Sequence, residues 1–277
     1  MTPEVPSGVI FTEKKMKLCT LVSGSSGNST YISDGTTSVL VDAGLTGKRI
    51  EEELSSIGVS AKELSAVFVT HEHNDHITSV GVIARRYGIP VYANRGTMKY
   101  LDAAGMLNRI MPENLIVFEN NKSFLCGTMT VKAFPIPHDA TDPVGYRFTS
   151  GGVSVAVSTD IGEITDDIRE GTKGCAAVVL EANHDIEMLK TGPYPYPLKK
   201  RILGRYGHLS NVSSADYACE LAEEGTETII LGHLSKENNL PELAFETVTK
   251  ELKKRGLLEK CSVMLAPRYS HGELIVC

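Results

Sequence analysis

The sequence has no tryptophan, no closely spaced cysteine pair and no hydrophobic run long enough to cross a membrane. Its six cysteines lie far apart, so neither a disulfide framework nor a zinc ribbon is expected, and the thiols fit a reducing compartment. The first residues show neither the basic nor the apolar region of a secretory signal. Together these absences predict a cytoplasmic protein with no membrane partner.

The sequence also lacks an excess of positive charge. Its 28 Lys and Arg residues face 34 Asp and Glu residues, which gives a net charge of −6. This balance disfavours a protein that coats nucleic acid through bulk charge, although it does not exclude local phosphate binding. With 42% hydrophobic and 22% charged residues among 277, the composition is that of a folded globular chain of one or two domains.

Short segments rich in β-branched and apolar residues recur along the chain and predict β-strands. They are residues 18–22, 38–42, 66–70, 115–118, 129–134, 153–159, 176–181, 228–231 and 262–265. Helical patterns end at Gly58 and Gly88, follow Ser210 or Asn211, and begin at Pro241. Because strands and helices alternate without a long linker, we expect one catalytic domain over residues 16–277 after a loose extension at residues 1–15.

A faint internal duplication supports an architecture with two similar halves. The segments ending in Asp42-Ala43-Gly44 and Asp160-Ile161-Gly162 both close an apolar strand with Asp-x-Gly. Two β-rich halves with outer helices fit a sandwich of two sheets covered by helices on both sides.

The strongest chemical signal is the segment HEHNDH at residues 71–76, directly after a predicted strand. By chance this histidine pattern is expected on the order of 0.01 times in such a chain. His71 and His73 lie two apart on extended backbone, so they point to the same side and can share one metal ion. Asp75 and His76 then offer an oxygen and a nitrogen to a second ion. The HExxH motif of zinc proteases does not fit, because Asp75 stands where its second histidine is needed.

Four ligands do not complete two metal sites, so further ligands are expected at other strand ends. His138, Asp160 and His233 each follow a predicted strand. A single histidine in such a place is more often a hydrogen-bonded loop residue. Beside the histidine cluster, however, the three residues indicate side chains that converge on one sheet edge.

This order of residues resembles the metallo-β-lactamase fold superfamily over residues 16–277. The resemblance implies an α/β fold, a four-layer αββα sandwich of two mixed sheets with outer helices. It also implies two divalent metal ions. Ligands of mixed histidine nitrogen and aspartate oxygen suit zinc, manganese or iron. One ion would be held by His71, His73 and His138, the other by Asp75, His76 and His233, with Asp160 bridging both and Asp42 orienting the ligands.

His208 lies 25 residues before His233 and precedes a predicted helix. A histidine at this offset resembles the nuclease and phosphodiesterase branch of the superfamily, which implies that His208 assists the leaving oxygen as a general acid and is not a metal ligand. The alternative is a structural histidine at the start of a helix.

Four segments narrow the resemblance to the YycJ/WalJ family: residues 23–29, 180–185, 194–201 and 207–211. The family implies a 5′→3′ exonuclease acting on double-stranded DNA through a metal-bridging hydroxide, with Asp75 and His208 as catalytic residues. The expected substrate contacts are Ser25, Ser26, Asn28, Lys199, Lys200, Arg201 and Asn211. The alternatives for these segments are a plain turn and a solvated helix face.

Three other activities remain open at this point. A small-molecule cyclic or nucleotide phosphodiesterase fits the acidic chain, and a tRNA 3′-processing ribonuclease shares most of the motifs. A lactamase or thioester hydrolase is disfavoured by the His208 element. The sequence assigns no role to Glu181, His184 or His271, and it leaves the oligomeric state undetermined.

Overall fold

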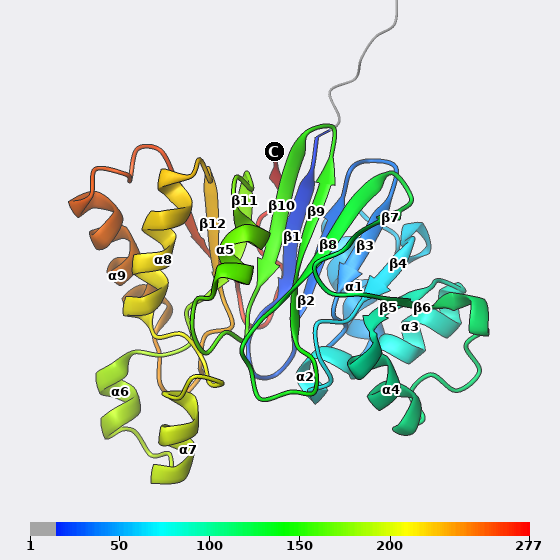
Figure 1. The fold of residues 1–277 in the computed structure, drawn as a ribbon, viewed down its shortest axis with the longest axis horizontal. Helices are drawn as coiled ribbons and strands as arrows, with labels where there is room; N and C mark the ends of the chain where they lie inside the picture. The colour runs from blue at the N-terminus through cyan, green and yellow to red at the C-terminus, as the bar shows by residue number, and fades with distance from the viewer. Residues whose placement is uncertain (1–14) are drawn as a thin grey trace, which may run out of the picture.

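The computed structural model describes residues 15–277, which form two seven-stranded sheets packed face to face with helices on both outer sides (Figure 1). The first sheet has the order β14 (Ile275–Val276), β1 (Lys17–Val22), β2 (Ser29–Ser33), β3 (Ser38–Val41), β4 (Ala66–Phe68), β5 (Val91–Asn94) and β6 (Leu115–Phe118). The second has the order β13 (Ser262–Leu265), β12 (Thr228–Gly232), β11 (Ala177–Glu181), β10 (Val153–Ser158), β9 (Val144–Ser150), β8 (Met129–Pro135) and β7 (Ser123–Cys126). This arrangement confirms the predicted four-layer αββα sandwich of mixed sheets.

The helices divide between the two outer faces (Figure 1). Those on the side of the first sheet are α1 (Gly47–Ser56), α2 (Asn74–Ile77), α3 (Val80–Tyr87) and α4 (Arg95–Ala103), with the 3-10 turns η1 (Ala61–Glu63) and η2 (Pro112–Asn114). Those on the side of the second are α5 (Asp166–Thr172), α8 (Asn211–Glu223) and α9 (Pro241–Lys254). Two short helices, α6 (Ile186–Thr191) and α7 (Tyr196–Ile202), project beyond the edge of the second sheet. No helix among residues 15–277 is long and apolar enough to span a membrane.

Three hydrophobic cores separate the four layers. Successive residues of a strand point to opposite faces, so in β3 Val39 and Val41 join the core between the sheets, while Leu40 joins the core beneath α1, α3 and α4. The third core lies between the second sheet and α5, α8 and α9. Strands buried on both faces explain why the predicted segments are nearly continuous in apolar residues.

All nine predicted strands are present, with ends that differ by a few residues. The strand predicted at residues 66–70 ends at Phe68 in the structure. The backbone N–H of Val69 still bonds the carbonyl of Tyr92 in β5 at 2.9 Å, whereas that of Thr70 bonds Oδ1 of Asp42 at 2.8 Å. The predicted extension at residues 1–15 falls almost wholly outside the described residues.

Candidate active site

The site lies along one edge of the sandwich, where strands of both sheets end. β3 and β4 are parallel neighbours in the first sheet, and β10, β11 and β12 are parallel in the second. β8 runs in the direction of β10 because both pair antiparallel with β9. The carboxyl ends of these strands therefore deliver Asp42, the HEHNDH segment, His138, Asp160 and His233 to the same edge, as the sequence predicts.

Three of these residues adopt left-handed backbone within two residues of the end of a strand. φ is 62° at Asp42, 61° at Asp160 and 54° at His233. Non-glycine residues rarely take this conformation, and such backbone clusters at functional sites, where the surrounding structure holds it in place. The turn it creates points each side chain across the sheet edge.

The Asp-x-Gly duplication has the same geometry in both halves. A Cβ on Gly44 would overlap the carbonyl oxygen of Asp75, and a Cβ on Gly162 would overlap that of Arg205. Both glycines are therefore required by the close approach of another loop. Each contact fixes the loop that carries Asp42 or Asp160.

The first ligand group brings together His71, His73 and His138, whose ligand atoms lie within 4.8 Å of one another. Nε2 of His71 is 3.1 Å from Nδ1 of His73. His138 Nδ1 donates to the carbonyl of Gly207 at 3.1 Å, which directs its Nε2 into the group. This is the set expected for one metal ion.

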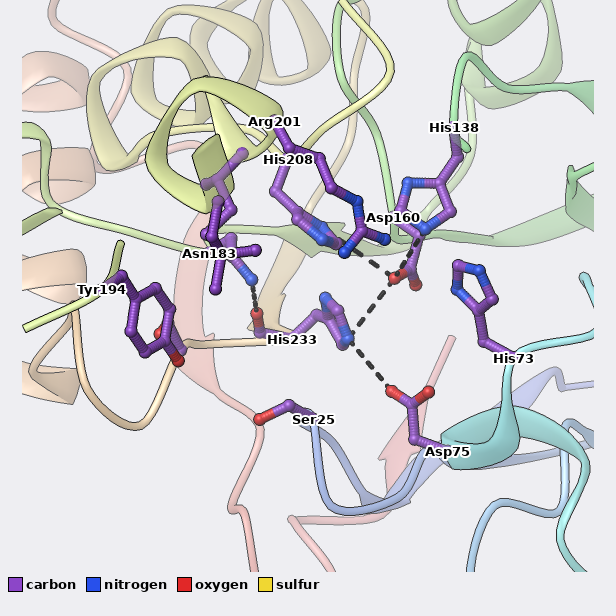
Figure 2. Close-up of a pocket in the computed structure, with 13 residues that line it drawn as sticks. Ser25, His73, Asp75, His138, Asp160, Asn183, Tyr194, Arg201, His208 and His233 are labelled. Atoms are coloured by element: carbon purple, nitrogen blue, oxygen red, sulfur yellow. Dashed lines mark hydrogen bonds and ion pairs between the residues drawn. The ribbon is translucent and has the colours of Figure 1, made fainter. Parts of the chain in front are cut away.

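The second group brings together Asp75, His76 and His233, again within 4.8 Å. Asp160 stands between the groups. Its carboxylate oxygens lie 3.4 Å from Nε2 of His233 and 3.8 Å from Nε2 of His138 (Figure 2), and 3.4 Å from Nε2 of His76. A carboxylate in this position can contact ions on either side, as the resemblance implies for Asp160.

The polar atoms at the centre of the site fit a divalent cation. Nε2 of His138, Nε2 of His233 and Oδ2 of Asp160 are buried and have no hydrogen-bond partner among the described residues. Each buried polar atom left in this way costs about 1–3 kcal/mol. Imidazole nitrogens and carboxylate oxygens are suitable ligands for zinc, manganese or iron, so ions bound in the two ligand groups would satisfy all three atoms.

Hydrogen bonds on the far side of the imidazoles orient them. His76 Nδ1 donates to Oδ2 of Asp42 at 2.7 Å. The same carboxylate accepts the Thr70 hydroxyl at 2.8 Å, and that hydroxyl lies 3.0 Å from Nδ1 of His71. Such bonds fix the tautomer and leave Nε2 facing a metal. This supports the orienting role expected for Asp42.

Burial and neighbouring charges shift the pKa values of His71 and His76 in opposite directions. Burial, followed by the neighbouring imidazoles of His76 and His138, holds the pKa of His71 well below its usual value, so this ring is in the neutral, ligating form. For His76, burial acts in the same direction, but the carboxylates of Asp160 and Asp42 outweigh it and raise the pKa to about 9. A divalent cation would displace the protons that these carboxylates attract.

Glu181 is the site residue to which the sequence assigned no role. It ends β11, is fully buried, and its Oε1 lies 2.8 Å from Nδ1 of both His208 and His233. Its Oε2 accepts the backbone N–H of Ile161 at 2.7 Å and that of Leu209 at 3.1 Å. In the sequence, Glu181 can be recognised as a charged residue at the end of an apolar strand, which is the pattern that predicted Asp160.

A cavity of about 250 Å³ opens over the two ligand groups (Figure 2). It is lined by ligand residues together with Ser25, Tyr194, Arg201, His208 and Asn183. Of the predicted substrate contacts, Ser25 and Arg201 therefore reach the site, and Ser26 is exposed beside it on the same loop.

The other predicted contacts lie elsewhere. Lys199 and Lys200 line a separate hollow on the outer face of α7, with the exposed ring of Tyr196. Asn28 is buried behind the second ligand group, where its amide nitrogen lies 3.2 Å from Oδ2 of Asp75 and 3.1 Å from Nε2 of His76. Asn211 is buried and bonds Asn239 at 2.9 Å, so neither asparagine lines the cavity.

The remaining histidines are placed apart from the ligand groups. His184 is buried, and neither ring nitrogen has a hydrogen-bond partner among the described residues. Burial lowers its pKa to about 4. His271 is half-buried, and its backbone N–H bonds Glu53 on α1 at 2.8 Å.

Comparison with known proteins agrees with this geometry. The family model for the beta-lactamase superfamily domain matches residues 37–233. The exodeoxyribonuclease WalJ of Streptococcus pneumoniae is 39% identical over 246 residues, which cover 89% of this chain and 91% of that protein. The exodeoxyribonuclease YycJ of Bacillus anthracis is 37% identical, covering 85% of this chain and 89% of that protein.

Solved structures extend the likeness of the fold. The metallo-β-lactamase fold protein YhfI of Bacillus subtilis superposes with a TM-score of 0.70 over 95% of this chain and all of that protein, at 16% identity. Fold and ligand arrangement together define a protein of the metallo-β-lactamase superfamily. Within it, the chain belongs to the family of the WalJ and YycJ exodeoxyribonucleases, which confirms the predicted family.

Proposed function

We propose that this chain is a metal-dependent 5′→3′ exonuclease that acts on double-stranded DNA. The observation that carries the proposal is that five histidines converge with Asp75 and Asp160 in two ligand groups beneath one cavity, which His208 also lines. Three ligand atoms there are buried without a hydrogen-bond partner among the described residues. The 37–39% identity to two exodeoxyribonucleases supports DNA as the substrate.

The residues present would hold two divalent ions. His71, His73 and His138 form one ligand set, Asp75, His76 and His233 form the other, and Asp160 serves both. Ions held there would neutralise the non-bridging oxygens of a phosphodiester and lower the pKa of a water molecule. Asp75, at the inner rim of the cavity, would orient the water that attacks phosphorus, which is the catalytic role expected for it.

His208 is placed to move a proton. It lines the cavity, only partly exposed, and is not needed to complete either ligand set. Because Glu181 accepts from Nδ1, Nε2 of His208 is the nitrogen that would give a proton to the leaving oxygen. The buried carboxylate stabilises the charged imidazolium while it holds the ring in place, as the acidic partner of a catalytic histidine does.

The remaining lining residues suit a nucleotide. Arg201 offers a guanidinium for a phosphate, and Tyr194 offers a ring on which a base can stack. Outside the cavity, Lys199, Lys200 and Tyr196 extend this positive and aromatic surface along α7. The net charge of −6 is compatible with this, because the cations needed for phosphate binding are gathered beside the site.

Three substrates offered in parallel separate the proposal from its rivals. The purified protein, loaded in turn with zinc, manganese and iron(II), is incubated with end-labelled duplex DNA, a tRNA precursor and a small phosphodiester. We expect stepwise loss of the duplex label with at least one metal. Cleavage of the small diester alone would reject the exonuclease, and accurate cleavage of the tRNA precursor alone would favour the ribonuclease.

A further inference from the structure

One side of the cavity is lined by Arg201 and Ile202, the first residues of the segment from Arg201 to Gly207, which we name the end wall. Nε of Arg201, in the last turn of α7, donates to Oδ2 of Asp139 in the loop after β8. Gly207, at the other end of the wall, accepts from His138 at 3.1 Å. The wall is thus bonded at both ends to the loop that carries a ligand residue.

A second set of contacts holds the end wall against the loop after β10. Nε of Arg205 lies 2.6 Å from Oε1 of Glu163. Gly162 packs so closely that a Cβ there would overlap the carbonyl of Arg205. Since this is the loop that carries Asp160, the wall is fixed to the ligand site on two sides and is not a loose lid.

The Arg201–Asp139 ion pair lies at one side of the cavity, where Arg201 is a lining residue and Asp139 stands behind it. Figure 2 shows Arg201 reaching from α7 over Asp160 towards His138, while Ser25 and Tyr194 lie on the opposite side of the opening. The side chains of Arg201 and Asp139 are 53% and 31% exposed, so the bridge lies at the mouth and not in the floor. At about 250 Å³, the cavity is slightly smaller than the ~300 Å³ at the lower end of ordinary small-molecule pockets.

We propose that the end wall, closed by the Arg201–Asp139 bridge, is the element that restricts this site to chain ends. A strand would enter from the side of Ser25 and Tyr194, and it would have to stop at the bridge. Its terminal phosphate would meet the Arg201 guanidinium, which binds phosphate oxygens in pairs. A continuous strand could not cross the ligand groups, so internal bonds would escape cleavage. This inference rests on the proposed nuclease function, and it adds a structural reason why the enzyme would act only at the ends of a strand.

The test compares one labelled strand in two forms. In the first it is a covalently closed circle, annealed to a shorter complement so that duplex and single-stranded regions are both present; in the second it is linear. Wild type, Arg201→Ala and Asp139→Ala are loaded with the same metal, and cleavage of the labelled strand is followed. The control is Arg169→Ala, which removes a similarly exposed ion pair with Glu220, on α5 and α8 away from the cavity.

We expect wild type and the control to degrade only the linear strand, and both bridge variants to cut the circle at least about tenfold faster than wild type. The Asp139→Ala variant opens the bridge and leaves the phosphate-binding guanidinium in place; because Oδ1 of Asp139 also lies 3.4 Å from Nε2 of His138, its metal content is measured in parallel. Variants that still degrade the linear strand but leave the circle intact would overturn the inference. Wild type that cuts the circle as fast as the linear strand would also overturn the inference, although the protein would then still be a nuclease. If wild type cleaves neither form, the proposed function itself is wrong and the inference falls with it. Thermal unfolding of each variant shows that it is folded.

Discussion

Nδ1 of His208 lies 2.8 Å from Oε1 of Glu181, and that carboxylate is completely buried. The same oxygen lies 2.8 Å from Nδ1 of His233, so one acid contacts both the histidine that we propose as a metal ligand and the histidine that we propose for proton transfer. Two backbone N–H groups fix its other oxygen. Glu181 therefore couples the two functions expected of this sheet edge.

Replacement of Glu181 by glutamine tests this coupling. We expect Glu181→Gln to lower kcat by about 10- to 100-fold, since one amide oxygen cannot replace a charged acceptor for two imidazoles. Steady-state kinetics with metal content measured in parallel would check this. An unchanged kcat at full metal occupancy would contradict it.

His208→Ala should separate proton transfer from metal binding. We expect kcat to fall by about 10²- to 10⁴-fold while the metal content stays that of wild type, because neither ligand set uses His208. Elemental analysis and single-turnover cleavage of duplex DNA give the two readouts. Loss of metal from this variant would instead make His208 a ligand.

His73→Ala should have the opposite signature. His73 is a member of the first ligand set, so its loss should reduce bound metal from about two ions per chain towards one and abolish cleavage. His271→Ala, which removes an imidazole outside the site, is the matched control. Full metal content in His73→Ala would show that the first ligand set is wrongly assigned.

His184 predicts an acid sensitivity of the fold. Burial lowers its pKa from 6.5 to about 4, so between these pH values the unfolded chain binds a proton that the folded chain does not. The stability linked to neutral His184 is therefore complete above pH 6.5 and is lost as the pH falls towards 4, by at most about 3 kcal/mol.

His184→Leu should accordingly show a shallower loss of unfolding free energy over that range. Urea denaturation of both proteins at a series of pH values measures the difference. Parallel pH profiles for the two proteins would mean that His184 does not contribute.

Much of the fold could be predicted because its strands are buried on both faces and so read as apolar runs. β2 was missed because Ser29, Thr30 and Ser33 make it polar in sequence, although every residue of it is buried. α6 and α7 were missed because they are only six and seven residues long, too short for a clear helical period. Their position beyond the sheet edge depends on tertiary packing.

The convergence of the proposed ligand residues could be predicted for a related reason: parallel strands deliver the residues that follow them to one edge. The orienting contacts could not, because Glu181 serves residues 27 and 52 positions away and nothing local marks such a partner. Asn28 and Asn211 were predicted as substrate contacts from loops beside the motifs. The structure turns both inward, where their amides bond buried polar groups.

The central claim is that the metal-loaded site removes nucleotides from the 5′ end of duplex DNA. The most direct measurement is a time course on two duplexes that differ only in carrying the label at the 5′ or the 3′ end, with wild type and His73→Ala. We predict that wild type releases the 5′ label at once as a mononucleotide and shortens the 3′-labelled strand stepwise, and that His73→Ala does neither. Early release of the 3′ label, or equal rates for wild type and His73→Ala, would contradict the account.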